Sequence, residues 1–152
     1  MSLFRYTMRL TGDADRAADI VQTAFVRLVE RPPPDEQIPP WLCRVATNAA
    51  SDQTRTLRRH TRLLNALPVG ASTGDAPRDP AHAAAQHDDQ RRVRAALEKL
   101  STRDRTILLM RAEGFAHREI AVAVGRTTRA IGVTILRALK KLERELRQDS
   151  VT

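Results

Sequence analysis

Glu119-Ile-Ala-Val-Ala-Val-Gly125-Arg-Thr127 is followed by a segment, from Thr128 to about Arg147, whose apolar residues recur every three or four positions. Small Ala121 lets two helices approach closely, Gly125 can adopt the left-handed conformation of a turn, and Thr127 can cap the following helix. This is the layout of a helix-turn-helix, whose second helix enters the major groove of DNA. An ordinary helical hairpin has the same layout, so the motif alone leaves both interpretations open.

Basic residues are concentrated around this motif. The whole chain carries a net charge of +8, from 26 Lys and Arg against 18 Asp and Glu. Residues 91–152 hold 15 basic and 7 acidic side chains, whereas residues 1–60 are nearly balanced at +2 and residues 61–90 carry −2. Such a basic block is the electrostatic footprint of a phosphate-binding surface. Charge and motif together favour DNA binding over a plain hairpin.

The composition favours an all-α chain of two small helical domains. Only 3% of the residues are aromatic, and Ala, Leu and Arg, which lose little side-chain freedom in a helix, recur throughout. Residues 68–80 contain three prolines and two glycines and break every helical periodicity. We therefore predict domains at residues 1–62 and 90–149, joined by a flexible linker over residues 63–89.

Helices can be placed within each domain from caps and breakers. In the first domain, residues 3–10 form a helix, Asp13 caps a second that ends before the prolines at 32–34, and a third runs over residues 41–60 after Pro39-Pro40. The helices predicted for the second domain are residues 91–100, a helix from a Ser101 cap to Gly114, residues 118–124 and residues 128–147.

Several functional classes are excluded by the residues present. The four histidines have no Cys or acidic partners at metal-ligand spacing, and no glycine-rich phosphate loop or nucleophile–base pair occurs, so we expect no metal, no cofactor and no enzymatic activity. The single cysteine, Cys43, lies in an apolar helical stretch and is predicted to be a core residue. The sequence contains neither an apolar run near ~18 residues nor a signal peptide, which predicts a cytoplasmic protein with no membrane span.

Further motifs occur in a defined order along the chain. Asp19, Gln22 and Phe25 lie in the second predicted helix, and Trp41-Leu, Asn48 and Asp52 follow in the third. Leu-Ser-x-Arg-Asp-Arg at 100–105 and Glu-Ile-Ala at 119–121 come after the linker. In this order and spacing they resemble the extracytoplasmic-function (ECF) sigma factors of the sigma-70 family. The resemblance implies region 2 of the family over residues 1–62 and region 4 over residues 90–149.

The resemblance also implies a function and partners. Such a protein binds core RNA polymerase, recognises the −10 and −35 elements of promoter DNA, and melts the promoter during transcription initiation. In the family a flipped base of the −10 strand is captured against the loop before the third helix, here about residues 33–40. An anti-sigma protein is a further partner that the resemblance allows.

The candidate site residues fall into three sets. Asp and Gln can make a joint polar contact with polymerase, carboxamides and carboxylates can read base edges, and guanidinium groups can hold phosphates. The polymerase-binding set is Asp19, Gln22 and Phe25, although Phe25 fits the buried stripe of its helix equally well. The −10 set is Asn48, Asp52, Arg55, Arg58 and Arg59. The −35 set is Arg126, Thr127, Thr128, Arg129, Thr134, Arg137 and Lys141.

Besides a first predicted helix that is shorter than usual for the family, the chain departs from the family pattern at two places that bear on DNA recognition. Ile38 stands where the family commonly has an aromatic residue before Trp41, and Pro39-Pro40 intervene. On the last helix, Gly132-Val133-Thr134 replaces a usual run of Lys, Ser and Arg, which removes two basic groups from the expected DNA face. These departures predict a promoter preference of its own.

A second function stays open at this stage. The chain could be a conventional helix-turn-helix transcriptional regulator that binds an operator as a dimer and does not join polymerase. That alternative predicts a dimer and tight binding to duplex DNA by the free protein.

Overall fold

All secondary structure in the described residues, 1–66 and 81–151 of this computed structural model, is helical, and side chains are described for 1–66 and 87–151. The all-α fold class is therefore confirmed. The elements are α1 (Leu3–Thr11), α2 (Ala14–Glu30), the 3₁₀ helix η1 (Asp35–Gln37), α3 (Ile38–Asn65), α4 (Ala81–Glu98), α5 (Thr102–Ala112), α6 (His117–Val124) and α7 (Thr128–Val151).

The caps predicted for three helix starts are present. In each case a side-chain oxygen accepts the backbone N–H three residues further on: Asp13 from Arg16 at 3.0 Å, Ser101 from Asp104 at 3.1 Å, and Thr127 from Ala130 at 3.2 Å. Gly125 ends α6 with a φ of +68°, a left-handed conformation that a glycine adopts without steric cost.

Three helices are longer than predicted. α3 begins at Ile38 instead of Trp41, because Pro39 and Pro40 fit a first turn whose N–H groups have no helical partner, and it continues to Asn65. α4 begins at Ala81, in a run of alanines that favours helix, and α7 continues to Val151. Helices thus occupy both ends of the predicted linker 63–89, whose middle, residues 67–80, lies outside the described residues.

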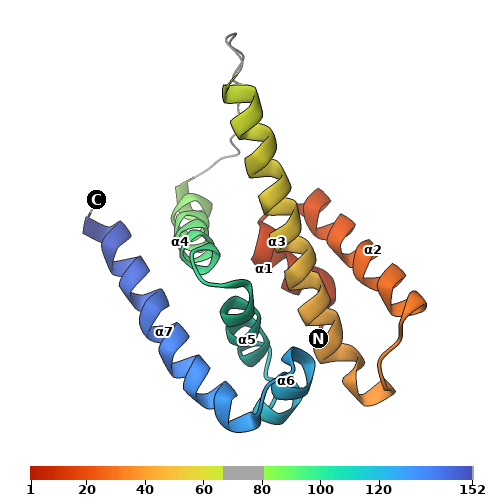
Figure 1. Ribbon diagram of the computed structural model, residues 1–152. Helices are drawn as coiled ribbons and strands as arrows, with labels where there is room; N and C mark the ends of the chain where they lie inside the picture. Colours follow the sequence, from red (N-terminus) through yellow and green to blue (C-terminus); the bar gives the residue numbers. More distant parts are fainter. Residues whose placement is uncertain (67–80, 152) are drawn as a thin grey trace.

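The helices form two units that pack against each other. α1, α2 and α3 make the N-terminal unit, and α4 to α7 make the C-terminal unit (Figure 1). α3 packs against α1 and α2 of its own unit and against α5 and α6 of the other, α1 also contacts α4, and α7 covers the far side of α4 and α5. The buried apolar side chains of both units join in one continuous core.

The core of the N-terminal unit contains a chain of polar groups. The fully buried Tyr6 hydroxyl lies 2.7 Å from Thr47 Oγ1, which donates in turn to the carbonyl of Cys43 at 2.8 Å. Burial raises the pKa of Tyr6 and raises that of the Cys43 thiol to about 12. Cys43 is fully buried, which confirms its prediction as a core residue.

The raised pKa of Cys43 predicts a loss of stability at alkaline pH. An exposed thiol has a pKa of 9.0, so above that pH the unfolded chain releases a proton that the folded protein keeps until about pH 12. Between those values the free energy of unfolding should fall more steeply with pH in the wild type than in Cys43→Ala, by up to about 1.4 kcal/mol per pH unit. Urea unfolding at a series of pH values measures both slopes. Parallel slopes would contradict the prediction.

Among the side chains that the structure describes, two ion pairs connect the units. Arg9 of α1 pairs with Glu113, after α5, at 2.5 Å, and Arg58 of α3 pairs with Glu98 of α4 at 3.2 Å. The Glu113 side chain is only 7% exposed, so its charge depends on Arg9 for compensation. The Arg58–Glu98 pair is more exposed and is worth correspondingly less.

A buried arginine lies in the same interface. Ser51 of α3 accepts hydrogen bonds from Thr102 Oγ1, at 3.2 Å, and from the guanidinium group of Arg105 on α5. Burial lowers the pKa of Arg105, and no ion pair with a carboxylate is found for it in the described part of the chain. The Nε atoms of Arg44, Arg94 and Arg105 are buried and lack hydrogen-bond partners among the described residues. Because incompletely paired buried charges are costly, this contact between the units is weaker than its apolar area suggests.

Candidate nucleic-acid and polymerase interfaces

α6 and α7 form a helix-turn-helix whose second helix is firmly placed. Ile120 of α6 and Ile131 of α7 are fully buried, and the N–H of Arg126 donates to the Ala121 carbonyl across the turn at 2.9 Å. Glu119 accepts the N–H of Ala116 at 2.7 Å and so fixes the start of α6. The first turns of α7 are therefore held rigidly at the surface.

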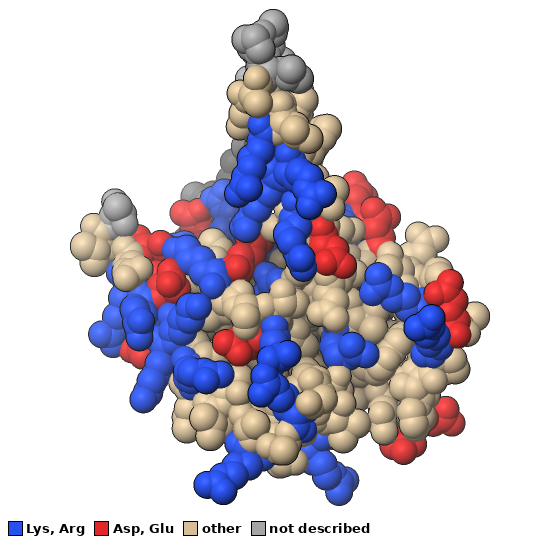
Figure 2. Space-filling view, viewed as in Figure 1, with Lys and Arg blue, Asp and Glu red and all other residues tan. Residues whose placement is uncertain are grey.

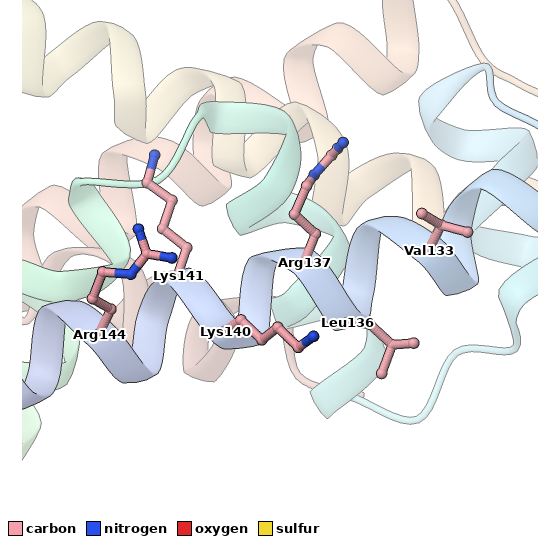
Figure 3. A pocket seen from close by; sticks show the side chains of 6 residues that line it. All are labelled: Val133, Leu136, Arg137, Lys140, Lys141 and Arg144. Atoms are coloured by element: carbon pink, nitrogen blue, oxygen red, sulfur yellow. The ribbon is translucent and has the colours of Figure 1, made fainter.

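α7 has a buried face and an opposite outward face. The buried face carries Ile131, Ile135, Ala138 and Leu142, which pack onto the core. The outward face, at the same three- and four-residue steps, carries the exposed residues Arg129, Val133, Leu136 and Lys140. Figure 3 shows Leu136 and Lys140 along one edge of the helix and Arg137, Lys141 and Arg144 along the other, lining a shallow open groove.

Most of the predicted −35 residues are exposed at this site. Exposed members of the set are Arg126, Thr127, Thr128, Arg129, Arg137 and Lys141. Thr134 is half-buried on the flank of α7, because it lies one helical turn from the buried residues Ile131 and Ala138. Val133 and Leu136 were absent from the predicted set. The three- and four-residue apolar steps already placed Val133 on the side of the helix away from the apolar stripe, and the same signal could have identified Leu136.

The predicted −10 residues lie along three successive turns of α3. Asn48 is half-buried, while Asp52, Arg55, Arg58 and Arg59 are exposed. Asp52 pairs with Arg55 at 3.2 Å on the surface, and Arg58 is engaged by Glu98 of the C-terminal unit. Basic side chains gather around the protruding end of α3 (Figure 2). The loop expected at residues 33–40 is shorter than predicted, since α3 already begins at Ile38.

The predicted polymerase residues share the exposed side of α2. Asp19 and Gln22 are exposed, and Phe25 is 47% exposed. The alternative that Phe25 belongs to the buried stripe is therefore wrong. The fully buried residues of α2 are Ala17, Ile20 and Ala24.

α2 also presents apolar residues that sequence reasoning missed. Val26 and Val29 are exposed and follow Asp19 and Gln22 at steps of four and three residues, so these four side chains form one stripe along the helix. We call it the α2 stripe. Phe25 lies beside it, at a groove formed with the starts of α1 and α3 and the turn between α5 and α6. A stripe with polar groups at one end and apolar groups at the other suits a protein partner.

Comparisons with known proteins match both units. The family model Sigma-70 region 2 matches residues 2–60, and the family model Sigma-70, region 4 matches residues 90–142. The chain is 29% identical over 145 aligned residues to the ECF RNA polymerase sigma factor EcfG of Rhodopseudomonas palustris, covering 93% of this chain and 77% of the relative. It is also 29% identical over 155 aligned residues to the ECF RNA polymerase sigma factor SigL of Mycobacterium tuberculosis, covering 99% and 85%. This chain belongs to the ECF group of the sigma-70 family.

A solved structure shows the same fold. The sigma factor RpoE from Bartonella quintana, in its complex with the anti-sigma factor NepR, superposes with a TM-score of 0.60 at 21% identity, covering 95% of this chain and 89% of RpoE. In this ECF sigma factor, the region 2 match covers α1, α2 and most of α3. The region 4 match covers α5, α6 and parts of α4 and α7.

Family membership defines the general role of this chain. It is a sigma factor for RNA polymerase, and the sigma-70 family consists of transcription initiation factors without catalytic chemistry of their own. None of the helices in the described ranges has the length and hydropathy needed for a membrane span.

Proposed function

We propose that this ECF sigma factor binds core RNA polymerase through the α2 stripe, binds the −35 duplex with α7 and reads the melted −10 strand with α3. The observation that carries the proposal is the division of the exposed surface among these helices. α2 offers adjacent polar and apolar groups, whereas α7 and the end of α3 offer guanidinium and ammonium groups. The first surface suits a protein, and the other two suit nucleic acid.

In this proposal, α7 lies in the major groove at the −35 element. Its first residues, including Arg129, are nearest the base edges, and Arg137 and Lys141 on the later turns contact phosphates. The N-terminal turns of α7 carry no acidic residue, and the first one along the helix is Glu143. Repulsion between the helix and the DNA backbone is thereby avoided.

The −10 strand is assigned to α3. The Asn48 carboxamide can donate and accept hydrogen bonds at exposed base edges and the Asp52 carboxylate can accept them, while Arg55 and Arg59 hold the backbone. Such readout requires bases that have left the duplex, so it accompanies promoter melting. Asp52 must exchange its surface pair with Arg55 for the DNA, which costs little because exposed ion pairs are weak.

Binding both elements requires the two units to move apart. Positions −35 and −10 are separated by roughly 85 Å of B-DNA at about 3.4 Å per base pair. α3, with 28 residues, is only about 42 Å long, and α5 packs directly against it. We propose that the packed arrangement is the free form, and that an anti-sigma protein would bind the chain in this form. The likeness to RpoE, which was solved in complex with the anti-sigma factor NepR, supports such a partner.

Run-off transcription tests the proposed function. The purified chain is added to bacterial core polymerase on a pool of genomic promoter fragments, with core alone and chain alone as controls. We expect transcripts from defined start sites only when both are present. Absence of core-dependent initiation, together with dimerisation by light scattering and tight duplex binding by the free chain, would instead support the dimeric regulator.

A further inference from the structure

Two apolar side chains interrupt the basic outward face of α7. Val133 and Leu136 are 58% and 66% exposed, and they lie between Arg129 and Lys140 on the side opposite the core. Burial inside the protein does not explain either residue. Their place on the proposed DNA-binding helix suggests that they become buried when DNA is bound.

Val133 is the one position of the Gly132-Val133-Thr134 run that faces outward. Gly132 is half-buried beside α6, where an added Cβ would lie 3.9 Å from the imidazole of His117, and Thr134 is half-buried on the flank. Val133 is the sixth residue of α7, one turn after Arg129. It therefore belongs to the part of a recognition helix that approaches base edges.

The chemistry of a valine limits what it can recognise there. Each base pair in the major groove presents hydrogen-bonding groups, but only thymine also presents an apolar group, its C5-methyl. A valine placed against any other base edge would remove water from a donor or acceptor without replacing the hydrogen bond. Contact with a thymine methyl has no such penalty and buries apolar surface on both sides.

We propose that Val133 recognises the methyl group of a thymine in the −35 element, beside a guanine contacted by Arg129. The inference rests on the proposed function and adds the base specificity of that site. A duplex is the occupant favoured by charge, because the exposed neighbours Arg137, Lys140, Lys141 and Arg144 are all basic. A guanidinium group can contact guanine O6 and N7 together, which suits Arg129 one turn earlier.

Deoxyuridine substitution in the promoter tests the contact by removing one thymine methyl group at a time. Holoenzyme, formed from the full chain and core polymerase, is assayed on a promoter that it transcribes in the run-off experiment. Each thymine of the −35 element, on either strand, is replaced in turn by deoxyuridine, which lacks only the methyl group. We expect one of these replacements to lower initiation by the wild type about fourfold, the factor that corresponds to the free energy of burying one methyl group.

Two variants assign that effect to a residue. With Val133→Ala, the sensitive thymine and deoxyuridine should support equal initiation, because the partner of the methyl group is gone. Val122→Ala is the matched control, since Val122 is a similarly exposed valine, 52% exposed, on α6 of the same motif. It should keep the full sensitivity. Circular dichroism checks that both variants fold.

Each outcome bears on the proposal. Insensitivity of the wild type to every deoxyuridine would overturn it, and so would unchanged sensitivity in Val133→Ala. The proposal would also be overturned if Val133→Ala initiated less than the wild type by the same factor on the thymine and the deoxyuridine templates. That result would indicate a protein contact at this position. Failure of the proposed function is distinguishable, because the wild type would then not initiate even on the unsubstituted promoter.

Discussion

Replacing Asp19 and Gln22 of α2 by alanine should abolish core-dependent initiation while the chain keeps its fold. Both side chains are exposed and make no hydrogen bond or ion pair with the residues that the structure describes, and α2 is held by the buried Ala17, Ile20 and Ala24. If each polar contact with polymerase is worth about 1.4 kcal/mol, the double change weakens binding of core on the order of a hundredfold. Run-off transcription at limiting sigma factor and a direct binding measurement with labelled core polymerase check the result.

A matched control exists on the other unit. Asp89→Ala plus Gln90→Ala removes the same two residue types from exposed positions of α4. We expect this variant to bind core polymerase like the wild type. Equal binding by the α2 variant and the wild type would remove α2 from the polymerase interface, and the exposed Val26 and Val29 would then need another partner.

Changing Arg9 to glutamate should separate the N-terminal and C-terminal units. The change places a second carboxylate beside the buried side chain of Glu113, so it replaces attraction by repulsion in a poorly solvated position. The remaining polar contacts between the units include Arg105, whose buried Nε is unpaired among the described residues, and the exposed Arg58–Glu98 pair. These are too weak to compensate. Small-angle X-ray scattering should show a radius of gyration rising from the roughly 15 Å of a compact chain of this length to above about 20 Å.

Exchanging the two charges provides the control for that experiment. Arg9→Glu combined with Glu113→Arg restores an ion pair with the opposite orientation, and the radius of gyration should return toward the wild-type value. Expansion in the single variant without recovery in the double variant would indicate local unfolding of α1 instead of separation. No expansion in Arg9→Glu would show that the apolar contacts of α3 with α5 and α6 hold the units together without this pair.

Several features of the chain were predictable because they depend on residues close together in sequence. Asp13, Ser101 and Thr127 cap helices through N–H groups three residues away, and Gly125 ends α6 through its own backbone conformation. Apolar steps of three and four residues likewise marked the buried face of α7. The far ends of α3 and α7 were placed too early, at residues 60 and 147, where no proline or glycine stops a helix, and α3 continues to Asn65, three residues before Pro68.

Contacts between distant residues decided the rest. Ala24 and Phe25 are neighbours on α2, and either could join the buried stripe until the position of α3 buried Ala24 and left Phe25 at the surface. Thr134 was the predicted DNA contact, but the packing of α7 on α5 turns it to the flank and leaves Val133 facing outward.

The sequence by itself therefore determined the helical fold, the helix-turn-helix and the family, since caps, periodicity and motif order are local or linear properties. Only the tertiary structure decided which side of each helix remains available to polymerase or DNA, and that Ser51 and Arg105 join the two units. The physical reason is that a helix has several faces of similar composition, and burial selects among them through side chains that are far away along the chain.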